Sequence, residues 1–173
     1  MVTKSNTKDK LIKNEEKEFE EQVVSVDRVA RVVKGGRRFR FRALVVVGDK
    51  KGRVGVGVAK GADVTSAVSK AVDVAKKSTI KVHLYKNTLT HEVMSKKAGA
   101  LVMLKPASAG TGVIAGSVVR VILESAGVSD ALSKSLGSSN KINNAYATMN
   151  ALQQLKPARQ WVTRQSKKVE ESK

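Results

Sequence analysis

Residues 32–60, VVKGGRRFRFRALVVVGDKKGRVGVGVAK, contain the clearest structural pattern in the chain. Its alternating pattern predicts a strand over residues 39–47 with two unlike faces. The apolar face, which can be buried, carries Phe39, Phe41, Ala43, Val45 and Val47, and the charged face carries Arg38, Arg40 and Arg42. Two glycine-containing turns flank the strand, Lys34-Gly35-Gly36-Arg37 and Gly48-Asp49-Lys50-Lys51-Gly52, and glycine supplies the positive φ of tight hairpins. With strands over residues 23–33 and 53–59, the prediction is a three-stranded antiparallel meander.

The charge of this meander indicates a nucleic-acid partner. Ten basic residues and one acid, Asp49, lie between Arg28 and Arg53, whereas a face needed only for solubility would mix both signs. Guanidinium groups on a strand are held in place before a phosphate arrives. We therefore expect the charged face and both basic turns to bind a nucleic-acid backbone. The alternative is a solvated sheet face.

Composition narrows the class of partner. The chain has 173 residues, 41% apolar and only 3% aromatic, and a net charge of +18, which favours salt-dependent binding to a polyanion. Sequence-tolerant binding of single strands relies on exposed rings, so folded or backbone-recognised RNA or DNA is the better candidate. A membrane surface is disfavoured, because no basic amphipathic helix and no apolar run near 18 residues is present. Without cysteine or an N-terminal signal core, we expect a cytoplasmic protein.

The rest of the first half completes one small domain. Residues 1–18 are polar and charged and predict an N-terminal segment that orders only against a partner. A helix is expected over residues 64–77, with Asp63 as its N-cap and an alanine and valine stripe that covers the sheet. Gly55 and Gly57 in the third strand indicate a close approach, either of an RNA backbone or of a neighbouring part of the chain.

The second half predicts further strands and helices. Two short strands surround Tyr85-Lys86-Asn87, and a strand over residues 99–105 is stopped by Pro106. A glycine-rich loop follows, and then a helix over residues 117–126 that ends at Gly127. A last helix starts near residue 142, with Ser139 or Asn140 as a cap, while Asn143 is free to contact phosphate or a neighbour. Residues 158–173 form a basic tail in which Trp161 is a candidate anchor.

The glycine-rich loop raises the alternative of a nucleotide site. Gly110, Gly112 and Gly116 precede a helix, whose free amides can bind phosphate. The spacing is GxGxxxG, no P-loop lysine follows, and Asp130 is not carried by a second strand, so this alternative is disfavoured.

Catalysis is also disfavoured. His91-Glu92 begins like a zinc-protease motif, but Ser95 stands where the second histidine is needed. No nucleophile elbow and no acidic pair at a strand end is present. We expect no enzyme, no cofactor, no metal and no small-molecule substrate.

Three motifs in order carry a family resemblance: VKGGRRFRFRALVVVGD, PASAGTGVIAG and AGVSDALSKSLGSSNKINNAYAT. Over roughly residues 19–155 the chain resembles bacterial small-subunit ribosomal protein five. The resemblance implies an α+β fold with a double-stranded-RNA-binding-like β-β-β-α domain over residues 19–82 and a C-terminal β-α-β-α two-layer sandwich over residues 83–157. It also implies a structural subunit that binds small-subunit ribosomal RNA and contributes to assembly, decoding accuracy and the messenger entry path. A free-standing double-stranded-RNA binder is the alternative.

The resemblance and the charge pattern together give the expected RNA-binding residues. They are Lys34, Gly35, Gly36, Arg37, Arg38, Arg40, Arg42, Lys50, Lys51, Arg53, Lys60, Thr111, Ser138, Ser139, Asn140 and Asn143. The resemblance further implies that messenger RNA lies near the arginine row. Ribosomal proteins four and eight are the implied protein neighbours, with residues 111–116 approaching RNA or protein four.

Overall fold

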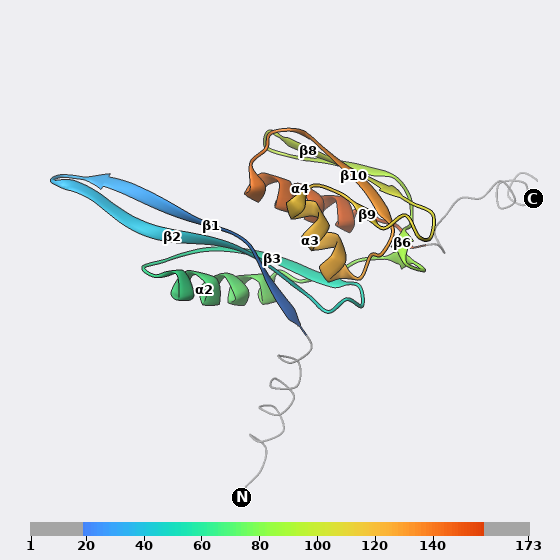
Figure 1. Ribbon diagram of the computed structural model, residues 1–173, viewed down its shortest axis with the longest axis horizontal. Helices are drawn as coiled ribbons and strands as arrows, with labels where there is room; N and C mark the ends of the chain where they lie inside the picture. The colour runs from blue at the N-terminus through green and yellow to red at the C-terminus, as the bar shows by residue number, and fades with distance from the viewer. Residues whose placement is uncertain (1–18, 158–173) are drawn as a thin grey trace, which may run out of the picture.

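A computed structural model describes residues 19–157 (Figure 1). The expectations for residues 1–18 and 158–173 lie outside this described part. The first half contains β1 (Glu20–Val33), β2 (Gly36–Gly48), β3 (Arg53–Gly61), α2 (Val64–Lys77) and β4 (Ile80–Lys81). The second half contains β5 (Leu84–Tyr85), β6 (Thr88–Leu89), β7 (Val93–Lys97), β8 (Ala100–Pro106), β9 (Val113–Ile114), α3 (Ser117–Ala126), β10 (Ala131–Gly137) and α4 (Lys141–Gln153). The α+β class and the β-β-β-α start are as predicted.

The first sheet is the predicted meander with one short strand added. Its order is β1-β2-β3-β4, and every neighbouring pair is antiparallel. β2 begins earlier than the predicted residue 39, because Gly35 takes the turn with φ 89° and pairing starts at once between Val33 and Gly36. The two long strands therefore form a hairpin longer than the sequence pattern indicated.

β2 is buried on both faces in its second half, which the two-face prediction did not anticipate. Ala43, Val45 and Val47 pack under α2, whereas Leu44 and Val46, on the same face as the arginines, join the core around α3 and α4. The prediction also placed Phe39 on the buried face, but its side chain is 49% exposed because α2 does not reach that far along the hairpin.

α2 has the predicted bounds and lies directly on β3. A Cβ at Gly57 would fall on the carbonyl oxygen of Ala71, and one at Gly55 on that of Ala75. The close approach that these glycines indicated is therefore made by the helix. Asp63 occupies the predicted N-cap position, but its side chain makes no capping hydrogen bond. The predicted position is therefore right and the predicted capping interaction is wrong.

The second half forms a sheet in the order β7-β8-β10-β9, with α3 and α4 between it and the first sheet (Figure 1). Both α3 and its end at Gly127, with φ 88°, are as predicted. β10 corrects the expectation that no strand follows α3. Its sequence, ALSKSLG, lacks β-branched residues, and the strand is stabilised by pairing with β8 and β9. Within residues 19–157, no helix is long and apolar enough to cross a membrane.

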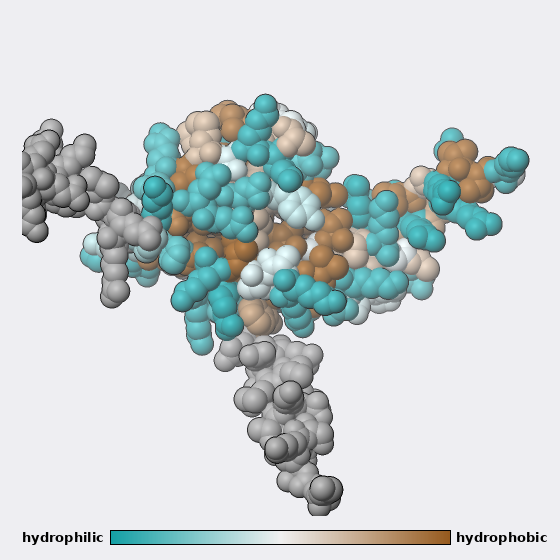
Figure 2. All heavy atoms as spheres, turned by 180° about the vertical axis from the view of Figure 1, so that it is seen from behind, coloured by the Kyte–Doolittle hydropathy of each residue, from teal (hydrophilic) through white to brown (hydrophobic). Residues whose placement is uncertain are grey.

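The outer half of the β1 and β2 hairpin projects beyond the rest of the fold (Figure 1). We call residues 28–41 the hairpin arm. All five residues at the start of β2, from Gly36 to Arg40, are exposed, and full burial begins only at Ala43. Seen from the other side, hydrophilic side chains dominate the projection, with apolar atoms near its tip (Figure 2). The basic residues are thus displayed away from the core.

Candidate nucleic-acid interface

Strand register places several basic side chains on one face of the hairpin arm. Directly paired residues point to the same side, and Arg31 lies opposite Arg38 while Val29 lies opposite Arg40. On the neighbouring strand, Lys60 of β3 lies opposite Arg42. The predicted residues Arg38, Arg40 and Lys60 therefore share one surface.

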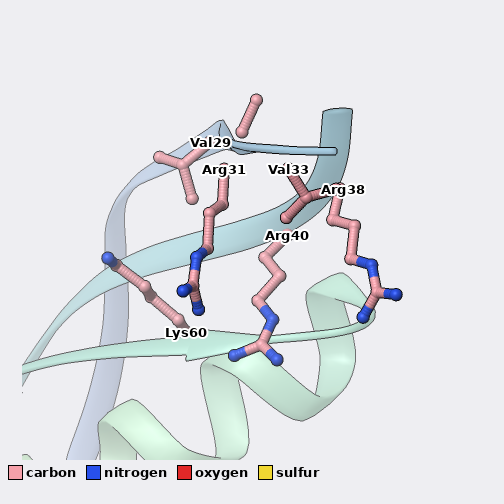
Figure 3. A pocket seen from close by; sticks show the side chains of 7 residues that line it. Val29, Arg31, Val33, Arg38, Arg40 and Lys60 are labelled. Carbon is pink, nitrogen blue, oxygen red and sulfur yellow. The ribbon is translucent and has the colours of Figure 1, made fainter. Parts of the chain in front are cut away.

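These side chains line a hollow of about 340 Å³, which we call the basic hollow. Arg31 and Arg40 extend in the same direction from the two strands of the hairpin, and Lys60 lies across from them on β3 (Figure 3). Val29 and Val33 supply an apolar surface between the charges. The site prediction missed Arg31, although the glycine turn centred between residues 34 and 35 already implied that residue 31 would face residue 38.

Arg42 belongs to the same row but has a partner within the chain. Its guanidinium donates a hydrogen bond of 2.9 Å to the carboxylate of Asp27, the residue directly opposite on β1. For Arg38 and Arg40, the described part of the structure offers no comparable carboxylate. The predicted row of three arginines therefore divides into two kinds. Arg38 and Arg40 have no paired carboxylate within residues 19–157, whereas Arg42 is paired with Asp27.

The opposite face and the tip of the hairpin arm carry the remaining basic residues of this region. The guanidinium of Arg28 lies 3.7 Å from the centroid of the Phe39 ring, a cation–π contact that fixes it on that face. Lys34, Gly35, Gly36 and Arg37 form the exposed tip, where a side chain at either glycine would meet nothing within 4 Å. The tip is thus free to approach a ligand closely.

The second basic turn, residues 48–52, is built around a buried carboxylate. Asp49 accepts hydrogen bonds from the Arg53 side chain at 2.7 Å and from the backbone amides of Lys51 and Arg53 at 2.8 and 2.9 Å. Burial raises the pKa of Asp49, but these hydrogen bonds and the Arg53 charge outweigh it, so the pKa lies below its ordinary value. Lys50 pairs with Glu20 at 2.6 Å. Lys50 and Arg53, both predicted RNA ligands, therefore hold carboxylates of their own chain.

This turn also joins the two halves of the molecule through its backbone. The amides of Lys50 and Gly52 each donate a hydrogen bond of 3.0 Å to the last carbonyls of α3, those of Ser125 and Ala126. A Cβ at Gly127 would fall on the Lys50 carbonyl, so glycine is required there for space as well as for its positive φ. The turn is thus a C-terminal cap for α3.

Asp130 fills the glycine-rich loop that raised the nucleotide alternative. Its Oδ1 accepts hydrogen bonds from the amides of Gly110 at 3.0 Å and Gly112 at 2.9 Å. β10 does follow α3, contrary to the expectation, and the amides of Gly110 and Gly112 are engaged by a carboxylate of the chain itself. Thr111 is exposed in this loop, and its amide donates to the carbonyl of Ser108 at 3.2 Å.

The start of α4 gathers most of the other predicted residues. Asn140 is the N-cap, and its side chain accepts from the amide of Ile142 at 3.0 Å. Ser138 and Ser139 line a hollow together with Gly116 at the start of α3, so the glycine-rich loop and this element meet. Asn143 lies beside them on α4 without lining the hollow. The sequence did not single out Asn144, which is buried and donates to the Ser138 carbonyl at 3.2 Å.

Comparison with known proteins agrees with both halves of this description. A model of the ribosomal protein S5 N-terminal domain matches residues 19–83, and one of the S5 C-terminal domain matches residues 95–165. The chain is also 54% identical over 144 residues to the small ribosomal subunit protein uS5 of two strains of Treponema pallidum. These alignments cover 83% of this chain and 84% of each relative. The chain therefore belongs to the ribosomal protein S5 family.

Proposed function

We propose that this chain is a structural constituent of the small ribosomal subunit and that it binds small-subunit ribosomal RNA through the hairpin arm. Family membership supports a place in the subunit. The observation that supports the arm as the main contact is its geometry. Arg31, Arg38 and Arg40 lie on a projection outside the core, and Arg31 faces Arg38 although like charges directly opposite one another destabilise a hairpin. A bound polyphosphate would remove that cost.

The family is one of ribosomal proteins and not of enzymes, which confirms the expectation that the chain is not a catalyst. Within the subunit, we propose that the arginine row lies near the messenger entry path and that the protein contributes to subunit assembly and decoding accuracy. A rigid basic projection suits these roles, because it can fix the relative positions of RNA segments without chemistry of its own.

For the protein neighbours, we propose ribosomal proteins four and eight. The outer face of the second sheet supports protein contacts, because α3 and α4 pack against its other face and leave apolar side chains exposed. Met94 is 51% exposed and Ile114, in the loop expected near protein four, is 55% exposed. Exposed apolar side chains suit a protein surface better than a phosphate backbone.

Sedimentation of a cell lysate tests the proposal. We expect nearly all of the protein to sediment with the small subunit, and the triple variant R31A/R38A/R40A to be released at lower salt. The matched control is K70A/K77A/K81A, which removes three exposed charges from α2 and β4, away from the hairpin arm. A wild-type protein found mostly in the soluble fraction at low salt would contradict a place in the subunit.

A further inference from the structure

The basic hollow has a composition that a plain phosphate contact does not need. Arg31, Arg40 and Lys60 provide charge on three strands, and Val29 and Val33, both half-buried, provide an apolar floor on either side of Arg31. Phosphate oxygens use only the charges. An apolar floor beside charged donors suits a ligand that has a flat apolar part and an anionic part.

Shape points in the same direction. A volume of 340 Å³ lies within the range of about 300–1,000 Å³ that is usual for small-molecule sites. A regular RNA duplex is convex and keeps its bases stacked inside, so it would touch the rim and leave the floor unused. Single-stranded loops and bulges, in contrast, present bases that can turn outward.

The charges of the hollow are available to such a ligand. Asp27, on the same face, is held by Arg42 at 2.9 Å, and no carboxylate lines the hollow. Arg31 and Arg38 lie directly opposite each other, which keeps the local potential positive. The opposite face differs, because Arg28 there is held on the Phe39 ring at 3.7 Å.

We propose that the basic hollow binds a single unstacked nucleotide of a folded RNA. Its phosphate would be held by Arg31, Arg40 and Lys60, and its base would rest on Val29, which lies opposite Arg40. This inference rests on the proposed RNA-binding function and makes it more specific. The hairpin arm would then recognise a bulge or internal loop and not the regular part of a helix.

Binding of the purified full-length protein to two RNAs tests this. One is a blunt duplex of about 16 base pairs, and the other has the same sequence with one unpaired nucleotide inserted at its centre. We expect the wild type to prefer the bulged RNA by about tenfold and R31A/R40A to bind both RNAs alike. R28A/R37A removes the same charge from the other face and tip, so it should weaken both complexes by one factor and keep the preference.

A further variant separates the floor from the charge. V29T/V33T keeps the branched shape and the charges but makes the floor polar, so the preference should fall while the salt dependence stays as in the wild type. The inference would be overturned if the wild type bound both RNAs equally, or if R31A/R40A and R28A/R37A both lost the preference for the bulged RNA. Either result would leave RNA binding by the hairpin arm intact. If neither RNA were bound although small-subunit ribosomal RNA was, the inference would be overturned and the proposed function would stand; failure to bind small-subunit ribosomal RNA as well would contradict the proposed function. Thermal melts by circular dichroism establish that each variant is folded.

Discussion

Asp27 and Arg42 lie directly opposite each other on β1 and β2, and the Asp27 carboxylate accepts a hydrogen bond of 2.9 Å from the Arg42 guanidinium. Their side chains are 44% and 33% exposed, so the pair stands at the base of the hairpin arm in partial contact with water. Beyond this pair, the charged side chains on the same face of the hairpin arm are all positive: Arg31, Arg38 and Arg40. One carboxylate thus marks where the structural part of the arginine row ends.

This pairing predicts that the arginines contribute unequally to RNA binding. R40A should lower the slope of log affinity against log salt by up to about one, whereas R42A should lower it by much less, because Arg42 is already neutralised. D27N should free Arg42 and steepen the slope. Binding to small-subunit ribosomal RNA fragments at several salt concentrations measures all three, and equal slopes for R40A and R42A would show that the row acts as one unit.

The glycine-rich loop should depend on Asp130 for its stability. D130A removes the acceptor of two backbone amides and should lower the free energy of unfolding by about 2–4 kcal/mol, whereas D130N keeps a neutral acceptor and should lose less. Urea unfolding gives both values. D73A, on an exposed residue of α2, is the control. If D130A cost no more than D73A, another contact would have to hold the loop.

Gly57 should be intolerant of even one added carbon. G57A places a methyl group on the Ala71 carbonyl and would push α2 off the sheet, so we expect a loss of about 3 kcal/mol in unfolding free energy. G99A is the matched control, since its Cβ would lie 3.5 Å from that of Ser138, and its effect should stay within about 0.5 kcal/mol. Equal effects would mean that α2 can shift without cost.

Acid should weaken the second turn through Asp49. Because the pKa of Asp49 is lowered in the folded chain, its carboxylate stabilises the fold above the unfolded pKa, and that stabilisation is lost as pH falls through the folded pKa. D49N should therefore be less stable than the wild type near pH 7, and the difference should shrink toward about pH 2. Unfolding free energies of both proteins across this range measure it, and a constant difference would contradict the assignment.

Local patterns were sufficient for the helices and for the meander. The bounds of α2 and α3 followed from an apolar stripe and from Gly127, because such signals act within one turn of chain. β10 was missed for the opposite reason, since its residues become a strand only between β8 and β9. Pairing across the sheet is not encoded in seven residues.

The positive charge of the candidate interface could be predicted from the sequence, but the carboxylates of the same chain that pair with its basic residues could not. Arg38, Arg40 and Lys60 were expected and do share a surface, whereas Arg31 needed the register that only the turn position sets. Lys50 and Arg53 are basic and were predicted to bind RNA, yet Lys50 forms an ion pair with Glu20 and Arg53 forms one with Asp49. A carboxylate that folding brings beside a basic residue decides whether its charge is available, and sequence spacing does not show this.

The backbone hydrogen bonds that cap α3 with residues 48–52 have a mechanical consequence. β2 leads directly from the hairpin arm into that turn. A force applied at the tip is therefore transmitted along the strand to α3 through main-chain hydrogen bonds. Main-chain atoms have less freedom to rearrange than long side chains. The hairpin arm and the second half of the fold should therefore move as one rigid body. A displacement of the arm by bound RNA would then also displace the second sheet and any protein in contact with it.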